Sequence, residues 1–289
     1  MRADIRILTL VVALASSRAV AQTGADGPLL ARRAAQPNAG LKFWVPAGRI
    51  RLVAWDRDSV VLRGRIARSA SLFIDGNSVG MKLAVERPGG EAGESNVVAY
   101  VPRGAKVSVK TVSAGIDAAG VTGWFYSVSG SVHLSGAATS VEVESMNGNL
   151  DLDVTTPWLR ARTGDGHLLL RGEPQDVDAS TIGGTLNIAA TTVLRGQFGS
   201  VSGDIHYVGS PAPGAIFEFS NHSGAVDLLL PPNVSGVFAL SSIIGSIQND
   251  FTAVRPIASA THSMRLSLGR GGSQVTVRTF KGSIRIRPQ

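Results

Sequence analysis

The chain has 289 residues, a formal net charge of +7 and no cysteine. The lack of cysteine excludes disulfides, thiolate metal sites and lipid-anchored lipoproteins, so burial and hydrogen bonds must hold the fold together. The basic surplus is scattered, with no run of Lys and Arg and no interleaved aromatic platform, which argues against a nucleic-acid-binding protein. It favours long-range attraction to anionic envelope surfaces.

The first 21 residues have the layout of a secretory signal peptide. Arg2 and Arg6 precede an apolar run from Ile7 to Ala15, and small residues then predict cleavage after Ala21. The alternative, an uncleaved membrane anchor, is disfavoured because the run is about half of the ~20 residues that span a bilayer. No later stretch is long enough to span. We therefore expect an exported protein of the periplasm or cell surface.

Residues 22–47 are expected to be a poorly ordered lead-in, and residues 48–289 a β-repeat domain. The lead-in is rich in Ala, Gly and polar residues and is broken at Gly27-Pro28, Pro37 and Gly40. From Gly48 onward, apolar and polar residues alternate over short stretches, which predicts strands. The candidate strands of this less regular N-terminal cap region, 48–110, are 49–53, 60–66, 71–79, 81–86 and 97–101.

Residues 111–289 are expected to form regular repeats. A glycine recurs at intervals of 15 to 21 residues, followed by a short alternating apolar segment. These glycines are Gly115, Gly130, Gly148, Gly166, Gly184, Gly203, Gly224, Gly245 and Gly282. The last interval is 37 residues, which we interpret as two periods with a degenerate unit around Leu266 to Gly272. A period of roughly 18 to 21 residues is typical of a stacked repeat architecture.

Further columns of similar residues are aligned on these glycines. Apolar residues stand two and four positions after most of them and five positions before, so that each set faces one side of a strand. Two positions after are Val132, Leu150, Leu168, Leu186, Ile205, Val226, Ile247 and Ile284, and five positions before are Phe125, Val143, Ala161, Ala179, Phe198, Phe219, Leu240 and Val277. Three positions before are Ser127, Ser145, Thr163, Thr181, Ser200, Asn221, Ser242 and Thr279.

The columns predict an all-β fold, a repetitive β-solenoid or β-helix-like stack whose units pair at about 4.8 Å and share one core. The Ser, Thr and Asn column is expected to bond to turn backbone, because eight copies without an adjacent base do not suit nucleophiles. Glycine is expected to supply backbone angles that other residues resist. The region from Gly48 to Pro102 and the final strand, Gly282 to Arg287, are the expected caps.

Three segments carry a family resemblance. Trp55-Asp56-Arg57-Asp58 follows an opening strand, Val101-Pro102-Arg103-Gly104-Ala105 comes next, and units such as Ser200-Val201-Ser202-Gly203-Asp204-Ile205 follow. Together they resemble a domain-of-unknown-function family of bacterial envelope proteins, built from β-strand repeats and labelled "putative adhesin". The resemblance covers about Gly48 to Pro288 and implies a β-solenoid-like or roll-like domain outside the cytoplasm. It implies no catalytic residues.

Two His–Asp pairs are the first candidates for chemistry. His133 and Asp151 stand three positions after the glycine in consecutive units, as do His206 and Asp227, so each pair is expected on neighbouring strands. Such a pair can serve catalysis or bind a metal. A site needs a third group and a pocket, and other residue types continue this column. We expect solvated cross-strand pairs.

Acidic residues near the turns are the second candidates. Asp151, Asp153, Asp165 and Asp204 would suggest glycoside chemistry or calcium binding if they converged. Asp at turns commonly makes local hydrogen bonds, and this is the reading that we prefer. The chain has no His-Glu-x-x-His motif, phosphate loop or dinucleotide fingerprint. We therefore predict no catalytic, cofactor-binding or metal-binding residues.

These observations predict an exported, non-catalytic structural or interaction protein of the bacterial envelope or cell surface, adhesin-like in role. Its expected partner is an envelope protein, a glycan or an anionic surface polymer. Two alternatives stay open. One is a carbohydrate-active β-helix enzyme, in which Asp151, Asp153 and Asp165 would meet in a groove. The other is an accessory sensor of envelope stress, which rests on family analogy alone.

Overall fold

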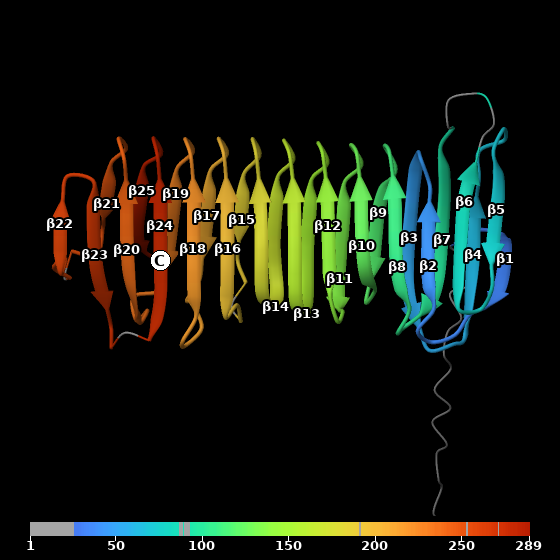
Figure 1. The fold of residues 1–289 in the computed structure, drawn as a ribbon, viewed down its shortest axis with the longest axis horizontal. Helices are drawn as coiled ribbons and strands as arrows, with labels where there is room; N and C mark the ends of the chain where they lie inside the picture. The colour runs from blue at the N-terminus through green and yellow to red at the C-terminus, as the bar shows by residue number, and fades with distance from the viewer. Residues whose placement is uncertain (1–25, 87–88, 90–92, 191, 253, 271) are drawn as a thin grey trace, which may run out of the picture.

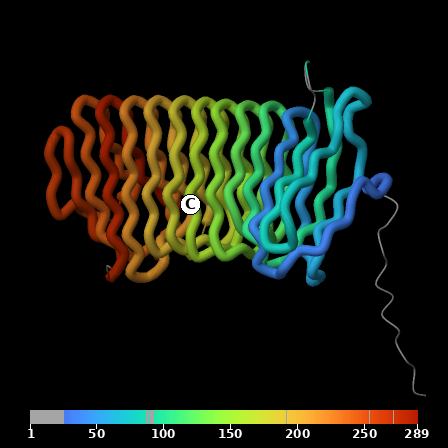
Figure 2. Tube along the Cα trace, turned by 45° about the vertical axis from the view of Figure 1, so that its right-hand side comes forward, coloured from blue at the N-terminus to red at the C-terminus, as the bar shows by residue number. Residues whose placement is uncertain are grey.

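The computed structural model describes residues 26–86, 89, 93–190, 192–252, 254–270 and 272–289, so the expected signal peptide, 1–21, lies outside the described residues. The described residues form twenty-five β-strands and no α-helix. Figure 1 and Figure 2 show these strands as two layers of a long stack. The prediction of an all-β solenoid is therefore confirmed.

Each coil contributes one strand to each of two layers, which we call the front and rear ladders after their position in Figure 1. In spatial order the front ladder contains β5 (Ser71–Gly76), β6 (Gly80–Glu86), β2 (Gly40–Trp44), β8 (Lys106–Thr111), β10 (Thr122–Ser127), β12 (Val141–Ser145), the second halves of β13 (Leu150–Thr163) and β14 (Leu168–Thr181), β16 (Arg195–Ser200), β18 (Ile216–Asn221), β24 (Ser273–Thr279), β20 (Gly236–Ser242), β23 (Ser263–Leu268) and β22 (Ala258–Ala260). The rear ladder contains β1 (Leu29–Ala34), β4 (Ser59–Arg65), β7 (Ser95–Pro102), β3 (Gly48–Trp55), β9 (Gly115–Ala119), β11 (Val132–Ala137), the first halves of β13 and β14, β15 (Leu186–Ile188), β17 (Ile205–Val208), β19 (Val226–Leu230), β25 (Ile284–Pro288) and β21 (Ile247–Asn249). The central coils pair in parallel, and antiparallel pairs occur only near the two ends among the described strands.

The core lies between the two ladders, where alternation along each strand places the apolar side chains. In β12, Val141 and Val143 are buried, whereas Glu142 and Glu144 point outward. The predicted apolar columns are buried in the same way, except that Ile247 is partly exposed. One continuous core therefore runs the length of the stack, as expected when no unit can bury its apolar face alone.

The glycine column has a different cause from the one expected. None of its glycines has a φ in the left-handed region. A Cβ added to Gly166 would instead lie 2.1 Å from the carbonyl oxygen of Gly148 in the preceding coil, and the other members after Gly115 show the same conflict. In the first unit the column position is Ala114 rather than Gly115, because a Cβ on Gly130 would meet the oxygen of Ala114. The column is thus a line of close backbone approach.

Seven of the eight members of the Ser, Thr and Asn column make the predicted hydrogen bonds to turn backbone. Ser145 Oγ accepts a hydrogen bond from the backbone N–H of Gly148 at 2.8 Å, and Asn221 Oδ1 accepts one from Gly224 at 3.1 Å. The Asn221 amide also donates to the carbonyl of Gly203 in the preceding coil. All eight side chains are buried, so these bonds satisfy seven polar groups that water cannot reach, whereas the Ser200 hydroxyl has no partner among the described residues.

The N-terminal region differs from the expected lead-in, 22–47, because its described part contains two strands. β1 pairs antiparallel with β4 at the edge of the rear ladder. β2 pairs in parallel with both β6 and β8, and β3 lies between β7 and β9. The coil formed by β2 and β3 is therefore inserted between two coils that follow it in the sequence.

The C-terminal coil is also out of sequence order. β24 lies between β18 and β20, and β25 lies between β19 and β21. Figure 2 shows this dark red coil among orange ones. The final strand, Gly282 to Arg287, is therefore interior rather than a cap. The expected degenerate unit near Leu266 is the β22–β23 hairpin, in which β23 covers the edge of β20.

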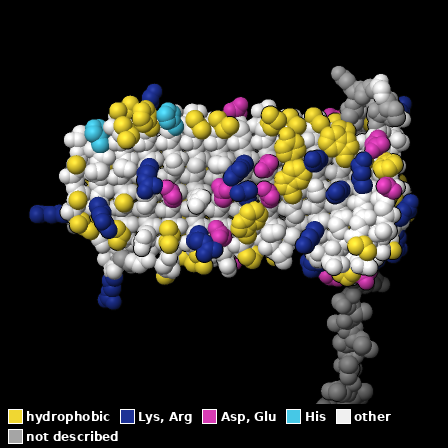
Figure 3. Space-filling view, viewed as in Figure 1, with side chains coloured by type: hydrophobic (Ala, Val, Ile, Leu, Met, Phe, Trp, Pro, Cys, Tyr) yellow, Lys and Arg dark blue, Asp and Glu magenta, His cyan; other side chains and the backbone are white. Residues whose placement is uncertain are grey.

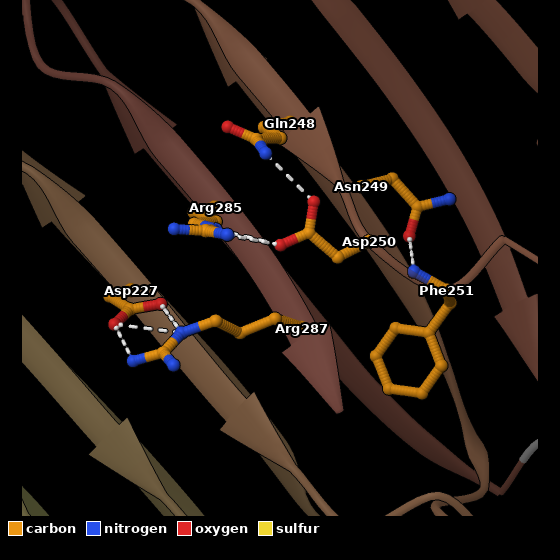
Figure 4. Close-up of polar contacts among 7 residues, drawn as sticks. All are labelled: Asp227, Gln248, Asn249, Asp250, Phe251, Arg285 and Arg287. Carbon is orange, nitrogen blue, oxygen red and sulfur yellow. Dashed lines mark hydrogen bonds and ion pairs between the residues drawn. The ribbon is translucent and has the colours of Figure 1, made fainter. Parts of the chain in front are cut away.

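Ion pairs hold the inserted strand β25 on both sides (Figure 4). Arg287 bonds to Asp227 of β19, with Nη2 2.8 Å from Oδ2. Arg285 bonds to Asp250, which follows β21, at 2.7 Å. The hydrogen bond from Arg285, with a further one from Gln248, lowers the pKa of Asp250. The bond to Asp227 raises the pKa of Arg287.

Candidate functional site

The outward face of the front ladder carries six neighbouring side chains that combine cations with aromatic rings. We call them the lysine–aromatic strip: Lys42 and Trp44 of β2, Lys82 of β6, Lys110 of β8, and Trp124 and Tyr126 of β10. Strand alternation explains their direction, because Leu41 and Phe43 are buried on the core side of β2. In Figure 3 hydrophobic side chains gather among cationic and acidic ones on this face.

Strand register brings the lysines around one indole ring. Lys42 stands directly opposite Lys82 on β6, and Trp44 stands opposite Lys110 on β8. Like charges directly opposite each other destabilise a sheet. Together they line an open hollow of about 420 Å³, in which Glu86 is the one lining carboxylate and pairs with Lys82 at 3.3 Å.

The rings of β10 continue the strip along the stack. Trp124 and Tyr126 lie two residues apart with nearly parallel rings, 5.7 Å between centroids and 21° between planes. The Nζ of Lys110 lies 5.0 Å from the Trp124 ring centroid, within the range of a cation–π contact. Both rings are partly exposed. The strip therefore offers amphipathic rings and ammonium groups on one outward face of the sheet.

Beyond Tyr126 the same face is hollowed into an open groove of about 760 Å³. The hollow has a simple cause, since Ser180, Gly199 and Ser220 occupy one outward row on three successive strands. Tyr126 lines the end of the groove that meets the strip. The strip and the groove thus form one continuous surface along the front ladder.

Exposed apolar side chains follow the front strands at their turns, and three of them, Met146, Ile182 and Val201, line the groove. We call this line the turn ridge. It consists of Val112, Met146, Ile182, Val201, Phe280, Ile243 and Ile244, all exposed. His222 stacks on Phe280, with 5.0 Å between ring centroids. The ridge is visible along the upper edge of Figure 3.

The predicted His–Asp pairs lie on the rear ladder, away from this surface. His133 Nδ1 is 3.4 Å from Asp151 Oδ2, and His206 Nδ1 is 3.9 Å from Asp227 Oδ2. Each pair lies on adjacent strands, as the repeat spacing predicts. Each carboxylate also binds an arginine, Arg171 or Arg287. These are cross-strand contacts between polar side chains on an outward face.

The predicted acidic residues do not converge. Asp151 and Asp153 lie on the rear half of β13, whereas Asp165 lies in a turn and lines the groove. Asp204 Oδ1 accepts a hydrogen bond from the backbone N–H of Ala225, which is the turn chemistry expected of it. Among the described residues there is no group of three or more His, Cys, Asp or Glu that could hold a metal ion. The arrangement on which the glycosidase alternative depended is therefore not formed.

Sequence reasoning missed the lysine–aromatic strip. Lys42 and Trp44 fall in the stretch interpreted as a lead-in, although Leu41-Lys42-Phe43-Trp44 has the alternation of a strand. Lys82 joins them through the inserted position of β2, which pairs strands forty residues apart, as in Gly40 with Gly80. Periodicity within the regular repeats gives no indication of that pairing.

The comparisons with known proteins add little. No protein-family model matches the chain, and no curated protein does. The resemblance to the envelope family thus rests only on the three sequence segments that were named for it. Within the described residues no helix has the length and apolar character to cross a membrane. Among solved structures, a chain from Clostridium sporogenes ATCC 15579 described as a "putative cell adhesion protein" is similar at 9% identity and a TM-score of 0.24, over 90% of this chain and 98% of that chain.

Proposed function

We propose that this chain is an exported, non-catalytic interaction protein of the bacterial envelope or cell surface, which holds its partner on the outward face of the front ladder. The lysine–aromatic strip carries this proposal. It joins partly exposed rings to ammonium groups on a sheet that is fixed by a continuous core. Aromatic rings with a wet edge are favoured at binding surfaces because they offer large contact area at little entropic cost.

The absence of convergent acid–base chemistry among the predicted residues supports a binding role over hydrolysis. The aspartates of the His–Asp pairs bind arginines on the rear ladder, and the other acidic candidates lie on two different faces. An elongated face with repeated units binds by area, which suits an extended envelope polymer or an envelope protein.

Co-sedimentation with isolated envelope fractions over a salt series tests the proposal. The chain beginning at Gln22 is expected to bind. The charge-reversed variant Lys42→Glu/Lys110→Glu is expected to bind about tenfold more weakly at low salt, because two of the three lysines of the strip become acidic. A matched control is Arg255→Glu/Arg270→Glu, which reverses two exposed charges outside the strip. Equal loss in both variants would mean that net charge alone is responsible. No binding at any salt would contradict the proposal.

A second measurement addresses catalysis. Incubation of acidic and neutral polysaccharides with the chain is expected to release no reducing ends. Release that disappears in a Glu144→Gln/Asp165→Asn variant would instead support an enzyme, since these two carboxylates line the groove.

A further inference from the structure

We propose that the hollow around Trp44 takes a carboxylate-bearing sugar unit, and that the ligand of the front ladder is an acidic polysaccharide running across the coils along the lysine–aromatic strip. This inference rests on the proposed function and names its partner class.

The first argument is charge that the fold leaves unpaired. Four arginines of the front ladder have acidic partners, among them Arg160, which contacts Glu142 and Asp178 at 3.6 and 3.3 Å, and Arg195, which contacts Asp176 at 2.7 Å. Arg265 of β23 has no such partner within the described part of the chain. Lys42 and Lys110 have no carboxylate partner among the described residues. Two lysines without a carboxylate partner therefore line the hollow beside Trp44.

The second argument is the like-charge pair. Lys42 and Lys82 stand directly opposite each other on parallel strands, an arrangement that costs stability in the unliganded protein. Glu86 balances only one of these charges. A carboxylate in the hollow would relieve the remaining repulsion, so the site favours an anionic group over a neutral one.

The third argument is the ring. Trp44 is partly buried in the wall of the hollow and presents an apolar surface between charged groups. A pyranose ring has an apolar face of C–H groups and a polar rim. The apolar face can pack on the indole of Trp44 while the polar rim accepts hydrogen bonds from the surrounding lysines. A simple inorganic anion would use the lysines but not the indole.

The fourth argument is spacing. The cations and rings recur on successive strands of the front ladder, β6, β2, β8 and β10, at about 4.8 Å per strand. One pyranose unit is close to this length, so consecutive sugars of a linear chain can meet consecutive coils. Trp124 and Tyr126 then contact the units beyond the hollow, and the groove continues the path.

Titration calorimetry with the chain beginning at Gln22 tests the inference. The probes are trigalacturonate, neutral maltotriose, short-chain polyphosphate and a thymidine oligonucleotide. We expect trigalacturonate to bind at least about tenfold more tightly than maltotriose, which is a difference of ~1.4 kcal/mol. Trp44→Ala and Lys42→Gln/Lys110→Gln should each weaken trigalacturonate binding by about tenfold or more.

Controls separate binding from folding. The lysine variant leaves the rings in place, so it stays informative if Trp44→Ala fails to fold, and Trp44→Phe should retain part of the binding. Trp158→Ala removes another exposed ring of the same ladder, outside the hollow, and should leave trigalacturonate binding unchanged.

Three results would overturn the inference. Trigalacturonate affinity that is unchanged in Trp44→Ala but reduced in Lys42→Gln/Lys110→Gln would show a site for charge alone. Tighter binding of the oligonucleotide than of trigalacturonate would assign the strip to nucleic acid. If the chain binds envelope fractions but not trigalacturonate, the acidic-glycan inference is wrong and the proposed function stands. If it binds neither, both the inference and the proposed function are wrong.

Discussion

At the scale of single residues, the glycine column depends on space between coils. A Cβ on Gly166 would lie 2.1 Å from the carbonyl oxygen of Gly148, so Gly166→Ala must push two coils apart. We expect a loss of about 1 to 3 kcal/mol in unfolding free energy, the usual cost of overpacking. Gly115→Ala is the matched control, because its Cβ would make an ordinary 3.6 Å contact with Ser131. Urea unfolding of both variants checks this, and equal effects would contradict it.

Tyr207 is a residue-scale irregularity in the core. It occupies a position held by Leu or Ile in most neighbouring coils, it is buried, and its hydroxyl has no hydrogen-bond partner among the described residues. Burial raises the pKa of this hydroxyl. Because an unsatisfied buried hydroxyl costs free energy, Tyr207→Phe is expected to stabilise the protein by about 1 kcal/mol. Thermal unfolding measures this, with the partly exposed Tyr126→Phe as control, and a destabilised Tyr207→Phe would mean that the hydroxyl has a partner.

At the scale of elements, β25 depends on its flanking ion pairs. The pKa of Asp250 lies below its ordinary 3.8, chiefly because Arg285 donates a hydrogen bond to it. The carboxylate therefore contributes stability that is fully present above pH 3.8 and is lost as pH falls through the lowered value. Hydrogen exchange should show β25 losing protection over this acid range before the central coils do.

Removing one partner tests the same element without acid. Arg287→Met keeps an unbranched side chain in place of the aliphatic part of arginine but loses the contact with Asp227. We expect faster exchange of the β25 amides and little change in β13 and β14, because local stability follows local contacts. Arg195→Met, which breaks a pair on the front ladder, is the matched control and should leave β25 unchanged.

At the scale of the whole molecule, periodicity predicted the stack and its core but not the order of the coils. The apolar columns from the Gly130 unit onward are buried as expected, apart from Ile247, because each unit repeats the same strand alternation. The inserted coils β2–β3 and β24–β25 pair with strands that are distant in sequence, and no local pattern specifies that choice. The lysine–aromatic strip depends on the insertion of β2 between β6 and β8. The sequence shows the residues of the strip, but it does not predict that they lie side by side.

The inserted C-terminal coil leads to the last prediction. A chain ending at Gly272 lacks β24 and β25, and this leaves β18–β19 on one side and β20–β21 on the other without their neighbours. Unpaired parallel edges are templates for association, so we expect the truncated chain to form oligomers, as measured by light scattering. The control is removal of only Pro288 and Gln289, which should leave the mass measured by light scattering the same as that of the full chain, apart from the two residues.

The opposite outcome has its own structural meaning. β18 and β20 both pair with β24 in parallel, through Phe219 and Leu240 opposite the same residue, Val277. A truncated chain that keeps the assembly state of the full chain, with β20 protected from exchange, would show that the coil of β20 can close directly onto the coil of β18. In that case the C-terminal coil would be an insertion into a stack already able to close, and the prediction of association would be wrong.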